Sequence, residues 1–371
     1  MKTRCDVALP SPASAPSWTA LRATAINIVA IHLLIFPPVL HRLPHFLPGI
    51  FIGALGRCLL AAEPPAEPLR LEQTIALTRV EGRIDHLDID VAGDRLFVCA
   101  LGNNSVEILD LRKGERVRSM AGLGAPQGLA YVPGLDRLLV ANDKDGLCQI
   151  YDAKSWQSIG TISLEDDADN VRYDSVHKEI LVGFGNGGIA VINAESGKQT
   201  GSITLAAHPE AFVLEKQGCR IFANLPNVRQ VAVIDRDKRE VTTTWKLEGA
   251  SANFPMALDE SSRRLFVACR NPAKLVVLDT QSGVTIANVD ISGDPDEVFF
   301  DARRRRLYVF CGEGFVDVID RVDPDRYKRS MKIPTASGAR TGLFVPERDA
   351  LFVAVPHRGA QPAEIRRYQV R

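Results

Sequence analysis

Two histidines, each close to a carboxylate, are the side chains of this chain best suited to proton transfer. His86 directly follows Asp85, and His208 lies two positions before Glu210. Imidazole titrates near neutrality, so either pair would suit a general acid or base in lactone or ester hydrolysis. No G-x-S-x-G elbow or other nucleophile signature accompanies them. These four residues are candidate catalytic residues, with hydrogen bonding at strand ends as the alternative role.

The same histidines are candidate metal ligands, because imidazole and carboxylate are common ligands of zinc. A shared ion needs both nitrogens within about 2.1 Å of the metal. His86 and His208 fall in the first and fourth of the repeats described below, three sevenths of a ring apart. We therefore expect no metal site and no cofactor.

Arginines in loops are the candidate anion-binding groups. Arg229, Arg270, Arg340 and Arg358 could each hold a carboxylate or phosphate with two parallel hydrogen bonds, although solvated loop arginines are common. The predicted ligand-binding set combines these types with their polar neighbours: Asp85, His86, Gln127, Asp169, Asn170, His208, Glu210, Asn253, Asp296, Arg340, Arg270 and His357.

Two further motifs carry weaker signals. The basic run 303–306 falls in a turn that we place on the opposite face from this set, so it gives little reason to expect nucleic-acid binding. The glycine-rich stretch 183–188 connects two predicted strands and opens no helix, so it lacks the helix N-terminus that a phosphate loop needs.

The elements that must position these residues recur along the chain. The string RLFV at Arg95 has counterparts beginning at Arg137, Glu179, Arg220, Arg264, Arg306 and Ala350, spaced 41 to 44 residues apart. A closing acidic or amide residue recurs with it, at Asp110, Asp152, Asn193, Asp235, Asp279 and Asp320. Short apolar strands at a fixed period in the low forties indicate a β-propeller with one four-stranded blade per repeat.

Both ends of the repeat region together supply one blade. The last unit contains only three strand patterns before Arg371, and residues 71–80 resemble the missing fourth strand. Pairing that segment beside the last strand would close the ring and remove two exposed sheet edges. The prediction is an all-β fold: a seven-bladed β-propeller of four-stranded antiparallel blades spanning residues 71–371.

Composition excludes some classes of protein. The chain has 371 residues, with 45 Lys+Arg and 45 Asp+Glu, so its net charge does not favour a general nucleic-acid binder. The seven cysteines form no C-x-x-C pair, and Cys99, Cys269 and Cys311 fall in RLFV-type strands. We expect buried free thiols.

Residues 1–62 differ in character from the repeats. Two apolar runs, 23–36 and 46–62, are accompanied by basic residues and end in Ala61-Ala62. This pattern predicts an export signal cleaved near those alanines, with a membrane tether if it is retained. Residues 63–70 read as a linker.

The repeats resemble a known family. The strings RLLVANDKDG (137–146) and RLFVACRNPAKLVVLD (264–279) are similar to the YVTN-type repeat of YncE-like seven-bladed propellers. Asn193 and Glu179 depart from the pattern. The resemblance implies an exported or cell-surface protein, and related propellers include lactonase-like proteins, cofactor-binding dehydrogenase subunits and binding scaffolds.

The function expected from these observations is binding. In a propeller, the links between blades and the loops between the second and third strands share one face, where loops vary on a fixed frame. We expect an exported monomeric scaffold that holds a small anionic ligand or a partner segment there. The alternative is a hydrolase or redox-cofactor protein that uses the histidines.

Overall fold

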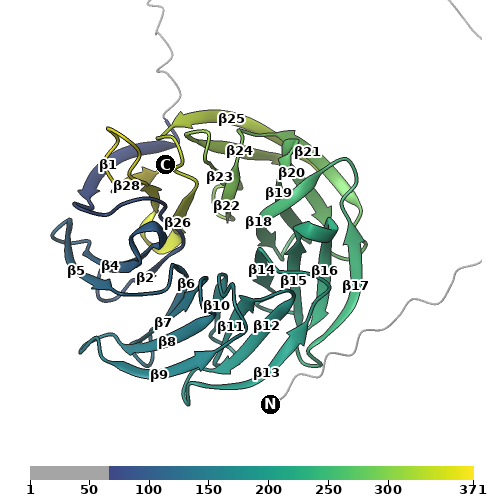
Figure 1. The fold of residues 1–371 in the computed structure, drawn as a ribbon. Coiled ribbons are helices and arrows are strands. Elements are labelled where there is room, and N and C mark those ends of the chain that lie inside the picture. The colour runs from purple at the N-terminus through teal and green to yellow at the C-terminus, as the bar shows by residue number, and fades with distance from the viewer. Residues whose placement is uncertain (1–66) are drawn as a thin grey trace, which may run out of the picture. The chain divides into compact units, whose positions relative to one another are not determined.

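The computed structural model describes residues 67–371, which form a single ring of seven antiparallel sheets around a central opening (Figure 1). The predicted export signal and the first half of the predicted linker lie outside the described residues. In each blade strand A is innermost and strand D outermost, and in six of the blades the chain runs from A to D without a break. Within residues 67–371, no helix has the length and apolar character needed to cross a membrane.

The first four blades follow one another along the chain. Blade 1 contains β2 (Leu87–Asp90), β3 (Arg95–Ala100), β4 (Ser105–Asp110) and β5 (Glu115–Ala121). Blade 2 contains β6 (Pro126–Val132), β7 (Arg137–Asn142), β8 (Leu147–Asp152) and β9 (Ser158–Ser163). Blade 3 contains β10 (Val171–Asp174), β11 (Glu179–Phe184), β12 (Gly188–Asn193) and β13 (Lys198–Thr204). Blade 4 contains β14 (Ala211–Leu214), β15 (Arg220–Leu225), β16 (Gln230–Asp235) and β17 (Glu240–Lys246).

The remaining blades include the one that joins the two ends. Blade 5 contains β18 (Ser251–Asp259), β19 (Arg264–Asn271), β20 (Ala273–Asp279) and β21 (Thr285–Asp290). Blade 6 contains β22 (Pro295–Asp301), β23 (Arg306–Cys311), β24 (Phe315–Asp323) and β25 (Arg326–Pro334). Blade 7 contains β26 (Thr341–Val345), β27 (Ala350–Val355), β28 (Glu364–Val370) and β1 (Leu69–Ala76). Three short 3₁₀ turns, η1 (Leu101–Asn103), η2 (Pro226–Val228) and η3 (Pro346–Arg348), lie between strands.

The seventh blade closes as predicted, with β1 antiparallel to β28 (Figure 1). The closing strand begins at Leu69, two residues before the predicted start, because Leu69 pairs with Val370 and is 3% exposed. It ends at Ala76, earlier than the predicted 80, because the chain turns where the Val80 amide donates to the Leu77 carbonyl.

The core consists of apolar clusters between neighbouring blades. The junction of blades 7 and 1 buries Ile75, Leu96 and Phe352 together, and the junction of blades 1 and 2 buries Phe97 and Tyr131. Each blade therefore depends on both neighbours for burial of its faces. Within residues 67–371 the five cysteines are free thiols, four of them buried, in agreement with the prediction for Cys99, Cys269 and Cys311.

The repeated arginine connects one blade to the next. Arg95 Nη1 donates to the Ala153 carbonyl of the following blade at 2.6 Å, and Arg137 Nη1 donates to the Ala194 carbonyl at 3.1 Å. Blade 3 has Glu179 at this position, and there the neighbouring blade supplies the cation, with Arg239 Nη2 3.2 Å from Glu179 Oε1. The departure from the repeat thus preserves a charged link between blades.

The repeated aspartate has a different task, which is to cap the turn between the third and fourth strands. Asp152 Oδ1 accepts the backbone N–H of Ser155 at 2.7 Å, and Asp279 Oδ1 accepts that of Ser282 at 3.0 Å. The amide oxygen of Asn193 serves equally well, accepting the Ser196 N–H at 2.8 Å. A turn cap needs an acceptor and no charge, which explains why this substitution is tolerated.

Candidate functional site

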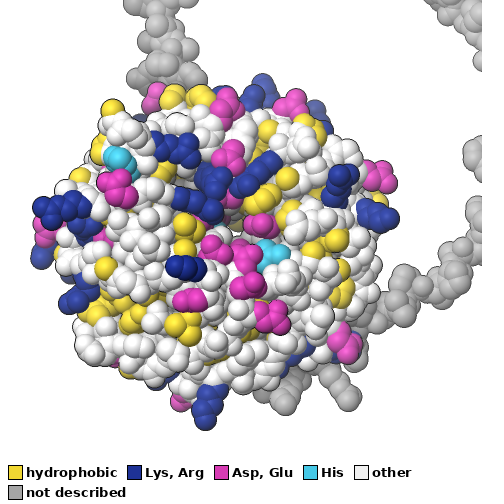
Figure 2. Space-filling model, viewed as in Figure 1, with side chains coloured by type: hydrophobic (Ala, Val, Ile, Leu, Met, Phe, Trp, Pro, Cys, Tyr) yellow, Lys and Arg dark blue, Asp and Glu magenta, His cyan; other side chains and the backbone are white. Residues whose placement is uncertain are grey.

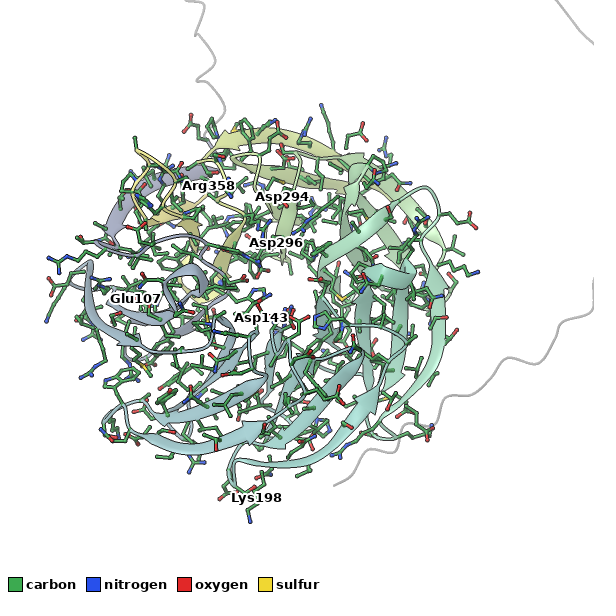
Figure 3. All side chains as sticks on the ribbon, in the orientation of Figure 1. Glu107, Asp143, Lys198, Asp294, Asp296 and Arg358 are labelled. Atoms are coloured by element: carbon green, nitrogen blue, oxygen red, sulfur yellow. The ribbon has the colours of Figure 1, made fainter. Side chains whose placement is uncertain are left out.

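The links between blades bring charged side chains together at one mouth of the central channel, here called the funnel ring. Its residues enclose a cavity of about 20 Å³, lined by Arg83, Asp85, His86, Gln127, Asp169, Asn170, Glu210, Phe254 and Asp296. Such a volume holds about one water molecule. Figure 3 shows Asp143 and Asp296 on opposite sides of the opening. Seven residues of the predicted binding set therefore meet here, but around a very small space.

His86 lies between two carboxylates. Its Nδ1 is 2.7 Å from Glu297 Oε1, and its Nε2 is 3.7 Å from Asp85 Oδ1. Burial lowers the pKa of His86, but the hydrogen bond and charge of Glu297 outweigh it and raise that pKa to about 9. His86 is therefore an imidazolium at neutral pH.

His208 is held in a similar way from another side of the ring. Its Nδ1 donates to the Gly185 carbonyl at 2.7 Å, and its Nε2 lies 3.2 Å from Asp169 Oδ2. Burial lowers the pKa of His208, but the hydrogen bond to Asp169 and the charge of that carboxylate outweigh burial. The net result is a pKa raised to about 9. Both ring nitrogens are engaged and the ring is charged.

The ring arginines are paired with carboxylates. Arg340 Nε is 2.9 Å from Asp296 Oδ2, and Arg340 Nη1 is 3.0 Å from Asp294 Oδ2. Arg270 contacts the same two aspartates and stacks over Phe254, with its Cζ 3.5 Å from the ring centroid. Arg83 pairs with Asp85. Each of these guanidinium groups is already paired with a carboxylate, so an anion would compete there with the protein's own acidic side chains.

Two carboxyl groups of the ring hold protons unusually well. Burial raises the pKa of Glu210 to about 7, with the charge of Asp169 adding to the effect. Burial also raises the pKa of Asp296 to about 6, against the influence of Arg340 and Arg270. The ring is therefore a compact titratable network.

Two predicted residues have other roles. Asn253 is fully buried, and its Nδ2 donates to Asn224 Oδ1 and to the Gln230 carbonyl, both at 3.0 Å. It joins blades 4 and 5 and does not line the cavity. His357 pairs with Glu81, Nδ1 to Oε2 2.7 Å, and also lies outside the cavity lining.

The arrangement offers little to a hydrolytic reaction. Both imidazoles are protonated and paired, so neither is free to accept a proton from a nucleophile. The lining of the ring cavity includes no serine, threonine, cysteine or lysine. Among residues 67–371, no group of three or more His, Cys, Asp or Glu side chains is placed to hold a metal ion.

A larger cavity of about 640 Å³ occupies the channel below the ring. His86 lines both cavities, so the His86–Glu297 pair separates the channel from the funnel face. At the other end the lining includes Pro133, Ser175 and Lys216, which follow the A strands. The channel is therefore reached from the face opposite the predicted site.

An acidic patch adjoins the ring on blades 2 and 3, formed by Asp143, Asp145, Glu165, Asp166 and Asp167. The Asp167 amide donates to the Asp143 carbonyl at 2.8 Å, which holds the two loops together. Burial and a side-chain hydrogen bond with Asp167 raise the pKa of Asp143. Glu165 and Asp166 are exposed and form no ion pair with a described residue. Figure 2 shows acidic side chains gathered on one side of the opening and basic ones on the other.

Sequence reasoning missed several of these residues. Arg83, Asp294 and Asp167 were not singled out as site residues, although the links that carry them were. Asp88 and Arg172, which line the channel, were missed altogether, because they lie on A strands and not in the loops where variable functional residues are expected. A signal was available: both charges stand at an A-strand position that is apolar in the other five blades.

Comparison with known proteins supports the fold. No protein-family model and no curated protein matches the sequence. Among solved structures, Kuenenia stuttgartiensis hydrazine synthase is similar with a TM-score of 0.66 and 18% identity, over 75% of this chain and 94% of that one. A chain of the mitotic checkpoint complex gives a TM-score of 0.68 and 12% identity, over 84% of this chain and 95% of that one. The WD40 repeats of RRP9 give a TM-score of 0.70 and 11% identity, over 82% of this chain and all of that one. These structures share the β-propeller fold with this chain.

Proposed function

We propose that this protein is a non-catalytic binding scaffold that receives a basic segment of a partner protein on its funnel face. The proposal rests on a difference in ion pairing between the acidic and the basic side chains of this face. Glu165 and Asp166 are exposed without an ion pair to a described residue, whereas Arg83, Arg270 and Arg340 each contact a carboxylate. A lysine or arginine of a partner would relieve the repulsion among the unpaired carboxylates.

A small anionic ligand at the ring is a weaker alternative. The ring cavity has room for a water molecule only, and its arginines are already paired. The propeller neighbours in solved structures include a multiprotein complex, which is in keeping with protein binding by this fold in general. A hydrolase is also less favoured, because His86 and His208 are protonated and paired.

We further propose that the protein is an exported member of the YncE-like propellers. The support is the apolar leader with its basic residues and the YVTN-type strings quoted above. The mass of the mature protein purified from its own cells tests this proposal. A mature chain starting near residue 63 is expected, and an intact Met1 in a cytoplasmic fraction would contradict it.

The binding proposal is tested by affinity capture from the cells that make the protein. The funnel variant Glu165→Gln/Asp166→Asn removes two unpaired charges from the funnel face. The control Glu195→Gln/Glu240→Gln removes two exposed charges on the opposite face, one in the turn before β13 and one at the start of β17. We expect a partner that the wild type and the control retain and the funnel variant loses. Equal retention by all three proteins would contradict the proposal.

A further inference from the structure

The channel cavity is built from one equivalent position in every blade. In each blade, the strand A residue that pairs with the third residue of the RLFV-type strand lines the cavity. These residues are Asp88, Ala130, Arg172, Val213, Ala257, Phe299 and Leu343. Five of the seven are apolar, as packing around a channel requires. The charges on Asp88 and Arg172 are not needed to build a blade.

Asp88 already has donors. Its Oδ2 accepts the Tyr131 N–H at 2.7 Å, and its Oδ1 accepts the Ile89 N–H at 2.8 Å. These bonds hold the carboxyl group against β6 and β2, so it links blades 1 and 2. Burial raises the pKa of Asp88 to about 6, so the carboxyl group is still mostly ionised near neutrality.

Arg172 uses only some of its N–H donors. Its Nη1 donates to the Val171 carbonyl at 2.8 Å, and its Nη2 donates to Asn170 Oδ1 at 3.1 Å. No carboxylate oxygen of a described residue lies within 4.0 Å of its guanidinium nitrogens. A guanidinium carries five N–H donors, so several remain available to a ligand. Arg172 differs in this respect from the paired arginines of the funnel ring.

The charges around the cavity favour an anion. His86 and Glu297 neutralise one another at the closed end. The remaining charged residues of the lining are Asp88, Arg172 and Lys216, and Lys216 forms no ion pair with a described residue. When all of these side chains are ionised, the lining of the cavity carries a net charge of +1. The rest of the lining is largely apolar and includes Phe299, Phe300, Met256 and Leu343.

We propose that the channel is a second binding site, for a small molecule with an apolar or aromatic body and one carboxylate that Arg172 receives. A volume of about 640 Å³ lies within the range of small-molecule sites, which are mostly apolar with a few placed polar groups. The ligand enters from the face of the A-to-B turns, so this site is separate from the proposed protein-binding face. Either proposal can fail without the other.

The test is calorimetric titration of the full chain with three probes that share a ring: phenylpropionate, phenylpropanol and phenylpropylamine. We expect phenylpropionate to bind most tightly. Arg172→Gln is expected to weaken its binding about 10- to 100-fold, the value of a hydrogen bond to a charged group. Val213→Trp is expected to abolish binding by filling the channel. Arg358→Gln, which removes an exposed charge from the funnel face, is the matched control and should change affinity less than about twofold.

Several results would overturn the proposal. One is the absence of phenylpropionate binding at millimolar concentration. A second is equal binding of the acid and the alcohol, which would leave Arg172 without a role. A third is tighter binding of the amine, which would assign the site to Asp88 and a cationic ligand. Circular dichroism and thermal melting establish that each variant is folded, and the comparison of Arg172→Gln with Arg358→Gln stands without Val213→Trp.

Discussion

The two funnel histidines show how a residue's neighbours decide its chemistry. In the sequence, His86 beside Asp85 and His208 near Glu210 suit acid–base catalysis. In the structure, Glu297 and Asp169 hold each imidazole as a cation, so the carboxylates stabilise a charge and do not activate a base. The partners come from other blades, at sequence separations of 211 and 39 residues.

The histidines predict a loss of stability in mild alkali. Each has a folded-state pKa of about 9 against an ordinary value of 6.5. Their contribution is therefore complete below pH 6.5 and is lost as pH rises through 9. We expect the thermal midpoint to fall between pH 7 and pH 9.5, and His86→Gln/His208→Gln to flatten that fall. An unchanged slope in the double variant would show that other groups titrate there.

Part of the site was predictable residue by residue. The repeat places Asp85, Asp169, Glu210 and Asp296 in equivalent links, so their convergence at one mouth followed from the period alone. Their pairing did not, because it depends on how far each side chain reaches across the ring. Asp88 and Arg172 could have been found by aligning the A strands, where they interrupt an apolar position.

At the scale of strands and turns, the basic run 303–306 has a structural use. Arg304 contacts Asp301 and Asp349 at 3.0 and 2.9 Å, and Arg303 also pairs with Asp349. Arg306 contacts Asp320 Oδ1 at 2.8 Å and donates to the Arg371 carbonyl at 2.9 Å. Three of the four arginines therefore connect residues of blade 6 with each other and with blade 7.

A neighbouring pair of substitutions tests this connection between blades. Arg306→Gln removes both contacts of a half-buried guanidinium and should lower the free energy of unfolding by about 1–2 kcal/mol. Arg305→Gln, at an exposed side chain in the same turn, should change it by less than about 0.5 kcal/mol. Chemical denaturation measures both. Equal effects of the two substitutions would contradict the role given to Arg306.

Elements were more predictable than their ends. The recurring apolar pattern and its fixed period predict the RLFV-type strands, the order of strands and the two faces of the ring. Every repeat contains the same pattern, so each one supports the same prediction. The start of β1 at Leu69 was misjudged because Pro68 and the residues before it resemble a linker. Only pairing with Val370, at the far end of the chain, extends the strand that far.

For the whole molecule, closure of the ring depends on β1. Residues 69 and 75 are buried apolar side chains, and burial of each contributes about 1.5–3 kcal/mol. A chain starting at residue 77 should therefore be less stable than one starting at residue 67 by at least about 3–6 kcal/mol. Denaturation midpoints of the two chains measure this. Equal midpoints would mean that the ring does not need its seventh blade completed.

The ring of charges separates two faces of the propeller. The funnel face carries the acidic patch, where we propose that a partner protein binds, and the channel cavity lies toward the opposite face. The division depends on seven blades, because the links that form the ring come from all of them.

Photocrosslinking from defined positions tests this division most directly. A photoreactive residue replaces Lys144, which is exposed beside the acidic patch, or Val176, which is exposed on the opposite face. Irradiation in the cells that make the protein is expected to give a covalent adduct with a partner protein from position 144 and none from position 176. An adduct from position 176 alone would contradict the assignment of the partner to the funnel face.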